Sequence, residues 1–166
     1  MAVDVYLNFN GNCREAVELY AEVFGTEKPH MMTFGETPPS PEFVMPEEAK
    51  DLIMHTRLNI EGSNVMFSDV FPGMPFTQGN NISLAFVSQD LEKVKAVFAK
   101  LSDGGSVKME LQETFWTKCY GSLTDRFGIE WQFNHDNGKT LPLMRRIIRG
   151  FVLNNISRNP IYNPQL

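Results

Sequence analysis

The stretch FWTKCYGSLTDRFGIEWQF, residues 115–133, decides the fold because it has the pattern of a β-hairpin. Residues 117–123 are predicted to form one strand, and residues 129–134 a second strand in which apolar and polar side chains alternate. Between them, Asp125 can accept a hydrogen bond from the backbone two residues on, and Gly128 can adopt a positive φ before the chain re-enters the sheet.

The second strand of this hairpin has two chemically different faces. Alternation places the apolar and polar side chains on opposite sides, Ile129, Trp131 and Phe133 against Glu130, Gln132 and Asn134. The apolar side can fill a core, whereas the polar side can face solvent or a polar cavity. The pattern leaves both possibilities open.

Composition places the chain among globular proteins. Its 166 residues suffice for one ordinary domain or two small fused modules, and 42% are hydrophobic while 21% are charged. A chain of this size can bury enough surface to fold without a disulfide or a structural metal. The formal net charge of −5 argues against a nucleic-acid partner, which would require a clustered basic surface.

Cysteine usage and the N-terminal segment favour a cytoplasmic protein. Cys13 and Cys119 lie in no metal-binding or redox spacing, so we expect reduced thiols. The N-terminal segment lacks the basic region and long apolar run of a signal peptide. No run approaches the roughly 20 apolar residues of a membrane span, so a membrane partner is not expected.

The remaining pattern predicts the same order of elements twice, namely a strand, a helix and three strands. In the first half we expect a helix at 13–23 and strands at 3–9, 30–34, 51–60 and 64–69. In the second half we expect a helix at 90–101 and strands at 82–87, 107–111, 117–123 and 129–134.

Capping residues support these helix boundaries. Asn12 and Asp90 are the predicted N-caps, and Gly25 is the predicted C-cap of the first helix. Residues 35–50 contain four prolines and are predicted to form a surface loop or a lid over a cavity.

Three segments resemble the vicinal oxygen chelate superfamily, which includes glyoxalase I, bleomycin-resistance proteins and fosfomycin-resistance enzymes. They are FNGNCREAVELYAEVFG (9–25), IMHTRLNIEGSNVMFSD (53–69) and the hairpin stretch, and the likeness is to the PhnB-like, 3-demethylubiquinone methyltransferase-like branch. The resemblance covers about residues 3–135. It implies an α+β fold of paired βαβββ modules in a cupped, mixed, mostly antiparallel sheet, the glyoxalase/bleomycin resistance fold, and commonly a homodimer.

We expect this domain to span residues 1–136, with modules at 1–70 and 80–136, and an extension at 137–166. Thr140 is the predicted cap of a C-terminal helix with one apolar side and three arginines on the other. Packing on the chain's own sheet or on a dimer partner is the favoured role, and a membrane-surface helix is the alternative.

Superfamily enzymes hold a divalent metal with His, Gln or Glu on the first and last strands of the modules. The matching positions here fall near Val5, Met66 or Ser68, Asn81 or Ser83, and Gln132. None is a His or a carboxylate, the ligands that divalent metals prefer. We therefore expect no metal and no cofactor at this place.

His55 is the one candidate catalytic residue, because an imidazole with an unperturbed pKa of about 6.5 can accept or donate a proton. The PhnB-like pattern has a His in the matching strand. A histidine that is hydrogen-bonded only for structure is the alternative.

Six further residues are candidate ligand contacts: Trp116, Tyr120, Glu130, Trp131, Gln132 and Asp69. The aromatic rings could line a pocket with polar tips, and the polar side chains could contact a ligand. The aromatic residues could equally fill the core, and Asp69 could serve only to stabilise a turn.

Two functions remain open. The first is binding of an unknown small molecule in a metal-free, aromatic-lined pocket. The alternative is a lyase, isomerase or dioxygenase-type enzyme, either metal-dependent or with His55 as general base. The sequence contains no Ser/His/Asp order, phosphate-binding glycine loop or dinucleotide-binding fingerprint, so the methyltransferase label of some relatives has no support in the motifs.

Overall fold

The computed structural model describes residues 4–38, 40, 42 and 44–136. The predicted C-terminal helix lies outside the described residues. The chain divides into two compact units, Met1–Asn81 and Ile82–Leu166, and each is described by itself. Within the described residues, no helix is long and apolar enough to cross a membrane.

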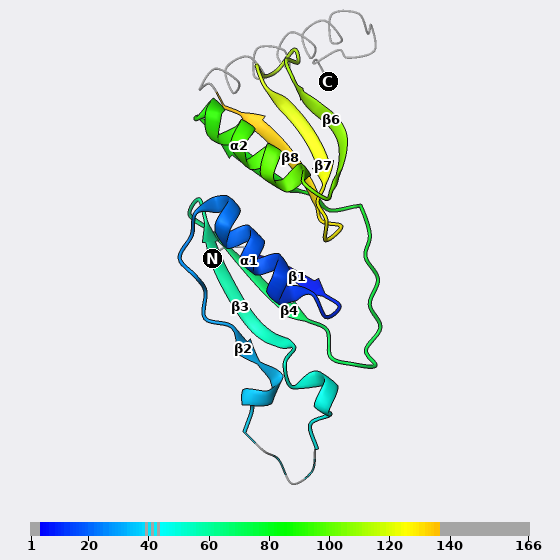
Figure 1. Ribbon diagram of the computed structural model, residues 1–166. Coiled ribbons are helices and arrows are strands. Elements are labelled where there is room, and N and C mark those ends of the chain that lie inside the picture. The colour runs from blue at the N-terminus through cyan, green and yellow to red at the C-terminus, as the bar shows by residue number, and fades with distance from the viewer. Residues whose placement is uncertain (1–3, 39, 41, 43, 137–166) are drawn as a thin grey trace, which may run out of the picture. The chain divides into compact units, whose positions relative to one another are not determined.

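The first unit is one four-stranded sheet with one long helix on it (Figure 1). Its elements in chain order are β1 (Val5–Phe9), α1 (Cys13–Phe24), β2 (Met32–Thr33), the 3₁₀ turns Phe34–Glu36 and Glu47–Ala49, β3 (Ile53–Ile60) and β4 (Ser63–Asp69). The strand order is β1-β4-β3-β2, in which β1 runs parallel to β4 and the other pairs are antiparallel.

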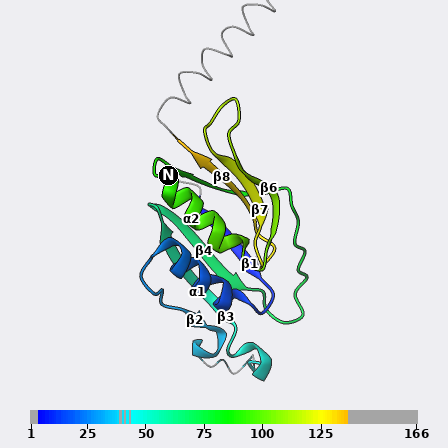
Figure 2. The ribbon, with the colours of Figure 1, turned by 45° about the horizontal axis from the view of Figure 1, so that its top comes forward.

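The second unit repeats this topology. Its elements are β5 (Leu84–Ser88), α2 (Leu91–Ser102), β6 (Ser106–Gln112), β7 (Tyr120–Thr124) and β8 (Glu130–His135), in the strand order β5-β8-β7-β6. The β5–β8 pair is parallel and the others antiparallel, and α2 lies along the sheet (Figure 2). The predicted α+β class and the repeated βαβββ order are confirmed.

Helix α1 packs by the predicted apolar face, but its N-terminal cap differs from the prediction. Its buried Tyr20 lies against Phe67 of β4, with ring centroids 5.9 Å apart. Asn12 stands at the predicted N-cap position, but its side chain makes no capping hydrogen bond. Asp69, which is distant in sequence, instead accepts hydrogen bonds from the backbone at the start of the helix.

The N-terminal cap of α2 and the turn of the β7–β8 hairpin agree with the predictions. Asp90 accepts a hydrogen bond from the Lys93 backbone at 3.1 Å. Asp125 accepts one from the backbone of Phe127, two residues on, at 2.9 Å. Gly128 has a φ of 81°, a conformation that residues with a Cβ rarely adopt.

Strand β2 is shorter than the predicted strand 30–34. It pairs only with Ile53 and His55 of β3. Before Met32, the His30 carbonyl accepts a hydrogen bond from the Thr56 hydroxyl at 2.9 Å in place of a backbone ladder bond. Beyond His55, the outer edge of β3 therefore has no neighbouring strand among the described residues.

Candidate functional site

The sheet of the first unit has a face that its helix does not cover, which we call the first open face. Alternation along β3 and β4 turns Leu58, Ile60, Val65 and Phe67 into the core beneath α1. The side chains of opposite parity form the open face: Tyr6, Asn8, His55, Arg57, Asn59, Asn64, Met66 and Ser68.

His55 contacts Tyr6 on this face. The Tyr6 hydroxyl lies 3.3 Å from His55 Nδ1, and the ring centroids are 5.9 Å apart. Strand β4 separates the two strands that carry these rings, so the pair bridges one strand of the sheet. Sequence reasoning missed Tyr6, although the alternation of VYLNF (5–9) already separates it from the buried Phe9.

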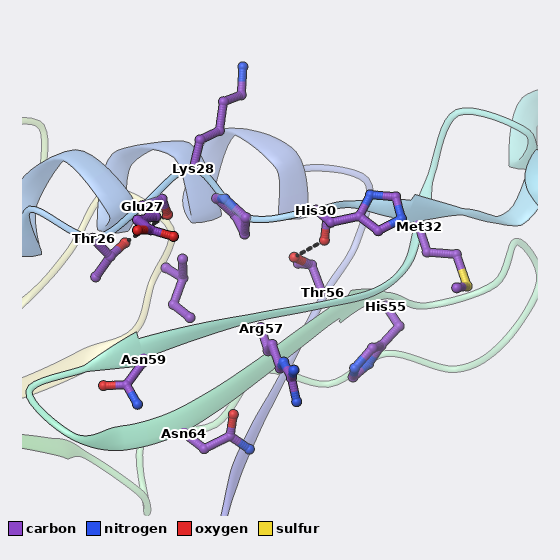
Figure 3. Close-up of a pocket in the computed structure, with 12 residues that line it drawn as sticks. Thr26, Glu27, Lys28, His30, Met32, His55, Thr56, Arg57, Asn59 and Asn64 are labelled. Carbon is purple, nitrogen blue, oxygen red and sulfur yellow. Dashed lines mark hydrogen bonds between the residues drawn. The ribbon is translucent and has the colours of Figure 1, made fainter.

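A cavity of about 900 Å³ lies at the free edge of β3 (Figure 3). It is lined by residues 26–30, Met32, residues 55–59 and Asn64. Its charged lining side chains are Glu27, Lys28 and Arg57. The cavity lining therefore includes charged residues of both signs.

The sheet of the second unit also has an uncovered face, which we call the second open face. Its polar side chains come from β7, β8 and the residue before β5: Ser83, Tyr120, Ser122, Thr124, Glu130, Gln132 and Asn134. Ala85 and Val87 of β5 lie beside Gln132 and Asn134 in the register. The Tyr120 hydroxyl donates to Gln132 Oε1 at 3.1 Å, and Gln132 Nε2 donates to Ser83 Oγ at 2.6 Å. Three strand positions are thus linked by one chain of hydrogen bonds.

Trp116 lies beside one end of this chain. It is half-buried, and its ring meets that of Tyr120 edge-on with centroids 5.5 Å apart. Phe115, 75% exposed, also meets Trp116 edge-on, with ring centroids 4.5 Å apart. The polar network therefore borders an aromatic cluster.

Glu130 occupies the same face and is held by two neighbours. Lys108 Nζ donates to Glu130 Oε1 at 2.7 Å, and the Thr124 hydroxyl donates to the same oxygen at 2.9 Å. The hydrogen bond from Lys108 lowers the pKa of Glu130 and outweighs the opposing effect of desolvation. The carboxylate is therefore ionised and already paired at neutral pH.

Asn134 brings an unpaired acceptor to the second open face. Its Oδ1 atom is buried and has no hydrogen-bond partner within residues 4–136 as described. In the sheet register Asn134 stands between Tyr120 of β7 and Val87 of β5. His135 Nδ1 is likewise buried and unpaired, while its Nε2 lies 3.1 Å from the Gln89 carbonyl.

Two predicted contact residues lie elsewhere. Trp131 is 4% exposed, and its indole nitrogen donates to Asp125 at 2.9 Å. Asp69 is also 4% exposed, and its two oxygens accept hydrogen bonds from the backbone N–H groups of Gly11, Cys13 and Ile53 at 2.8, 3.1 and 2.9 Å. Both side chains stabilise the fold where they are, and their role in ligand binding stays a prediction.

The predicted site residues therefore divide between the units. Tyr120, Glu130 and Gln132 share the second open face, with Trp116 at its border. His55 belongs to the first open face. Sequence reasoning placed Asn134 on the polar side of its strand and Ser83 at a position that matches a superfamily metal ligand, but named neither as a ligand contact. It missed Arg57, which the strand alternation could have placed on an open face.

The donor set does not fit a divalent metal. No group of three or more His, Cys, Asp or Glu side chains comes together in the described part of the chain. Of the positions that match the superfamily's metal ligands, Gln132 is the strongest donor, and its amide is used by Tyr120 and Ser83. No chemistry through a metal follows from these residues.

Comparison with known proteins gives family and fold. A family model described as 3-demethylubiquinone-9 3-methyltransferase matches residues 2–134. Protein YjdN of Escherichia coli is 34% identical over 143 residues, which are 81% of this chain and 95% of YjdN. The solved structure of protein PA1353 of Pseudomonas aeruginosa is 36% identical in sequence, with a TM-score of 0.71. The match covers 81% of this chain and 96% of the PA1353 chain.

A more distant structure bears on the fold alone. The fosfomycin resistance protein FosX of Listeria monocytogenes is 11% identical with a TM-score of 0.55, over 81% of this chain and 91% of FosX. FosX is a vicinal oxygen chelate protein, so the expected glyoxalase/bleomycin resistance fold is confirmed.

Proposed function

The chain belongs to the PhnB-like family described as 3-demethylubiquinone-9 3-methyltransferase, and from this premise we propose that it binds a small organic molecule on the second open face. The site is bordered by aromatic rings and needs no metal. The ligand carries a hydrogen-bond donor, such as a hydroxyl, amine or amide group.

The observation that carries this proposal is the unpaired Oδ1 of Asn134. A buried acceptor without a partner costs about 1–3 kcal/mol, and native proteins rarely tolerate one without a reason. Because Oδ1 is itself buried, a ligand must displace the side chains that cover it, and its donor group then recovers that cost on binding. The neighbouring Tyr120 and Gln132 hold fixed hydrogen-bond positions, so they can orient such a ligand.

The aromatic cluster supplies the apolar half of the site. Small-molecule sites combine aromatic walls with a few well-placed polar groups. Trp116 is half-buried and Phe115 is exposed, so both rings have surface available for contact. A ligand with a planar apolar part and one donor group fits this combination.

The test uses tryptophan fluorescence, because the two tryptophans differ. Trp116 borders the site, whereas Trp131 is buried and bonded to Asp125. A screen of small organic molecules is expected to find compounds that change the emission of the native protein but not that of W116F. For such compounds, N134L and Y120F are expected to weaken binding by about tenfold, the effect of one good hydrogen bond.

Asn10→Leu is the matched control, because it removes the same side chain from an exposed turn of the first unit, outside both open faces. It should leave the affinity unchanged. N134S, which keeps a polar atom in a smaller side chain, guards against misfolding of N134L. Compounds that bind N134L, N134S and the native protein equally tightly would refute the proposed site.

An enzymatic function is the second candidate, and the Tyr6–His55 contact is the observation that favours it. If His55 Nδ1 carries the proton and donates to the Tyr6 oxygen, Nε2 is free to act as general base in a lyase, isomerase or dioxygenase-type reaction. A compound that the native protein converts, and that H55Q binds but does not convert, would establish this function.

Methyl transfer is not our proposal, despite the family's description. In the first unit, the turn from the first strand into the helix contains one glycine, Gly11. In the second unit, the corresponding turn contains no glycine. Nucleotide-type cofactors are usually held by glycine-rich turns at such positions. Neither turn offers that backbone.

We further propose that the protein is a cytoplasmic homodimer. The two free, buried thiols of Cys13 and Cys119 support a reducing compartment. Exposed apolar side chains on the sheets, Val87 at 51% and Met109 at 40%, support a partner copy. Light scattering should give twice the chain mass of 18.9 kDa, and a monomer mass would overturn the dimer.

A further inference from the structure

We propose that the first open face is a second binding site, which takes the anionic group of a small organic molecule through Arg57. The residues of this site all lie in the first unit. Its anchor groups are Arg57, His55 and Asn59, which alternate along β3 on one face.

Arg57 is exposed and unpaired. Within the described residues its guanidinium makes no hydrogen bond or ion pair. In the register it stands in one row with Met66 and Tyr6, so the guanidinium has a sheet surface beneath it. A planar guanidinium binds a carboxylate or phosphate with two parallel hydrogen bonds, which makes an anion its natural partner.

His55 can supply a second donor. When the Tyr6 hydroxyl donates to Nδ1, across 3.3 Å, the neutral imidazole carries its proton on Nε2. That N–H is then available to a ligand. Figure 3 shows His55 and Arg57 projecting to the same side of β3.

Asn59 can supply a third donor. Its Oδ1 is already used, because it accepts a hydrogen bond from the Gly62 backbone at 2.9 Å. Its amide nitrogen is therefore the free end. Asn64, its register partner on β4, is less suitable because its nitrogen lies 3.4 Å from a carboxylate oxygen of Asp4.

The cavity beside β3 sets the size and charge of the ligand. Its volume of about 900 Å³ is far larger than an inorganic ion needs, so the anionic group belongs to a larger molecule. Lys28 and Glu27 also line the cavity, and the Lys28 ammonium projects away from β3 (Figure 3). Arg57 is therefore the lining cation on the side of β3 that carries His55, which favours an anionic ligand.

The test is an NMR titration of the full chain with inorganic phosphate and, separately, acetate, at constant ionic strength. We expect saturable shifts at the Arg57 side-chain Nε–H and at the backbone of residues 57–59. R57Q should weaken binding about tenfold, and R57K should also weaken it because a lysine keeps the charge but loses the paired geometry. E27Q should tighten binding by about twofold, since it removes the repelling charge.

Arg14→Gln is the control, because it removes the same charged group from α1, outside the cavity lining. It should leave the affinity unchanged. A stronger response to phosphate than to acetate identifies a phosphate-bearing ligand, and the reverse identifies a carboxylate. Shifts that do not saturate, or that R57Q and R14Q alter equally, would overturn the proposal.

Discussion

The indole nitrogen of Trp131 donates a 2.9 Å hydrogen bond to Oδ2 of Asp125, which sits in the turn that leads into β8. The other oxygen, Oδ1, accepts from the backbone of Phe127 at 2.9 Å and of Ile129 at 3.0 Å. One buried carboxylate therefore fixes the turn and the largest core side chain of the hairpin together.

Replacement of Asp125 is expected to destabilise the protein strongly. In D125N an amide nitrogen must face either the indole N–H or the backbone N–H groups, so at least one buried donor loses its acceptor. We expect the free energy of unfolding to fall by about 2–4 kcal/mol, measured by urea denaturation. D103N is the control, because Asp103 forms an exposed ion pair with Arg126 and should cost less than about 1 kcal/mol. Equal losses in the two variants would contradict this assignment.

Asp69 is expected to hold the start of α1 on the sheet. Its carboxylate accepts from three backbone N–H groups, those of Gly11 and Cys13 before and at the helix start and that of Ile53 on β3. D69N should lower the free energy of unfolding by about 1–3 kcal/mol and speed hydrogen exchange at these amides. N12A should have little effect, since Asn12 makes no capping hydrogen bond. If N12A lowered the free energy of unfolding more than D69N does, the capping role predicted for Asn12 from the sequence would be supported instead.

These two aspartates show what the sequence pattern could predict. Asp125 acts within its own turn, so local turn chemistry was enough to identify its hydrogen bond to Phe127. Asp69 acts on residues 56 and 58 positions away along the chain, through a contact that exists only once the sheet has formed. Local capping preference therefore pointed to Asn12.

The candidate site shows the same division. Alternation along β8 correctly placed Trp131 with Phe133 on the buried face, and Gln132 on the other. It could not show that Tyr120 bonds Gln132, because this requires the register of two strands. The local sequence pattern also could not predict that β2 is short, because the Thr56 hydroxyl takes the place of a backbone ladder bond to the His30 carbonyl.

Glu130 is expected to make the stability of the protein depend on pH in the acidic range. Lys108 lowers its pKa in the folded protein below the usual 4.5, so the unfolded chain takes up the proton first as the pH falls. The contribution is therefore fully present above the unfolded value and is lost as the pH drops through the folded pKa. The difference in urea stability between E130Q and the native chain should be present at about pH 7 and shrink towards about pH 3. A difference that is unchanged at low pH would contradict this role.

Cys13 is expected to be inert towards thiol reagents in the native protein. Its side chain is fully buried, and burial, together with the charge of Asp69, raises the pKa of the thiol to about 12. Burial also raises the pKa of Cys119. Neither should react with an aromatic disulfide reagent at about pH 8 before the protein unfolds, whereas both should react in denaturant. Rapid labelling of C119S, in which only Cys13 remains, would disprove the inert assignment.

Divalent metals are expected to leave the melting temperature unchanged, because the described residues bring no three metal-binding side chains together. A metal present at 100 times its dissociation constant adds about 2.7 kcal/mol to the stability of the native state. For a chain of this length that corresponds to a rise of roughly 5–10 °C, which a thermal melt detects easily. Dialysis against EDTA, followed by nickel, manganese or zinc, should therefore shift the transition by less than about 1 °C. A larger rise that H55Q abolishes would identify His55 as a ligand and make the metal-dependent enzyme the leading function. A rise that H55Q retains would place the metal on other residues and also contradict the prediction.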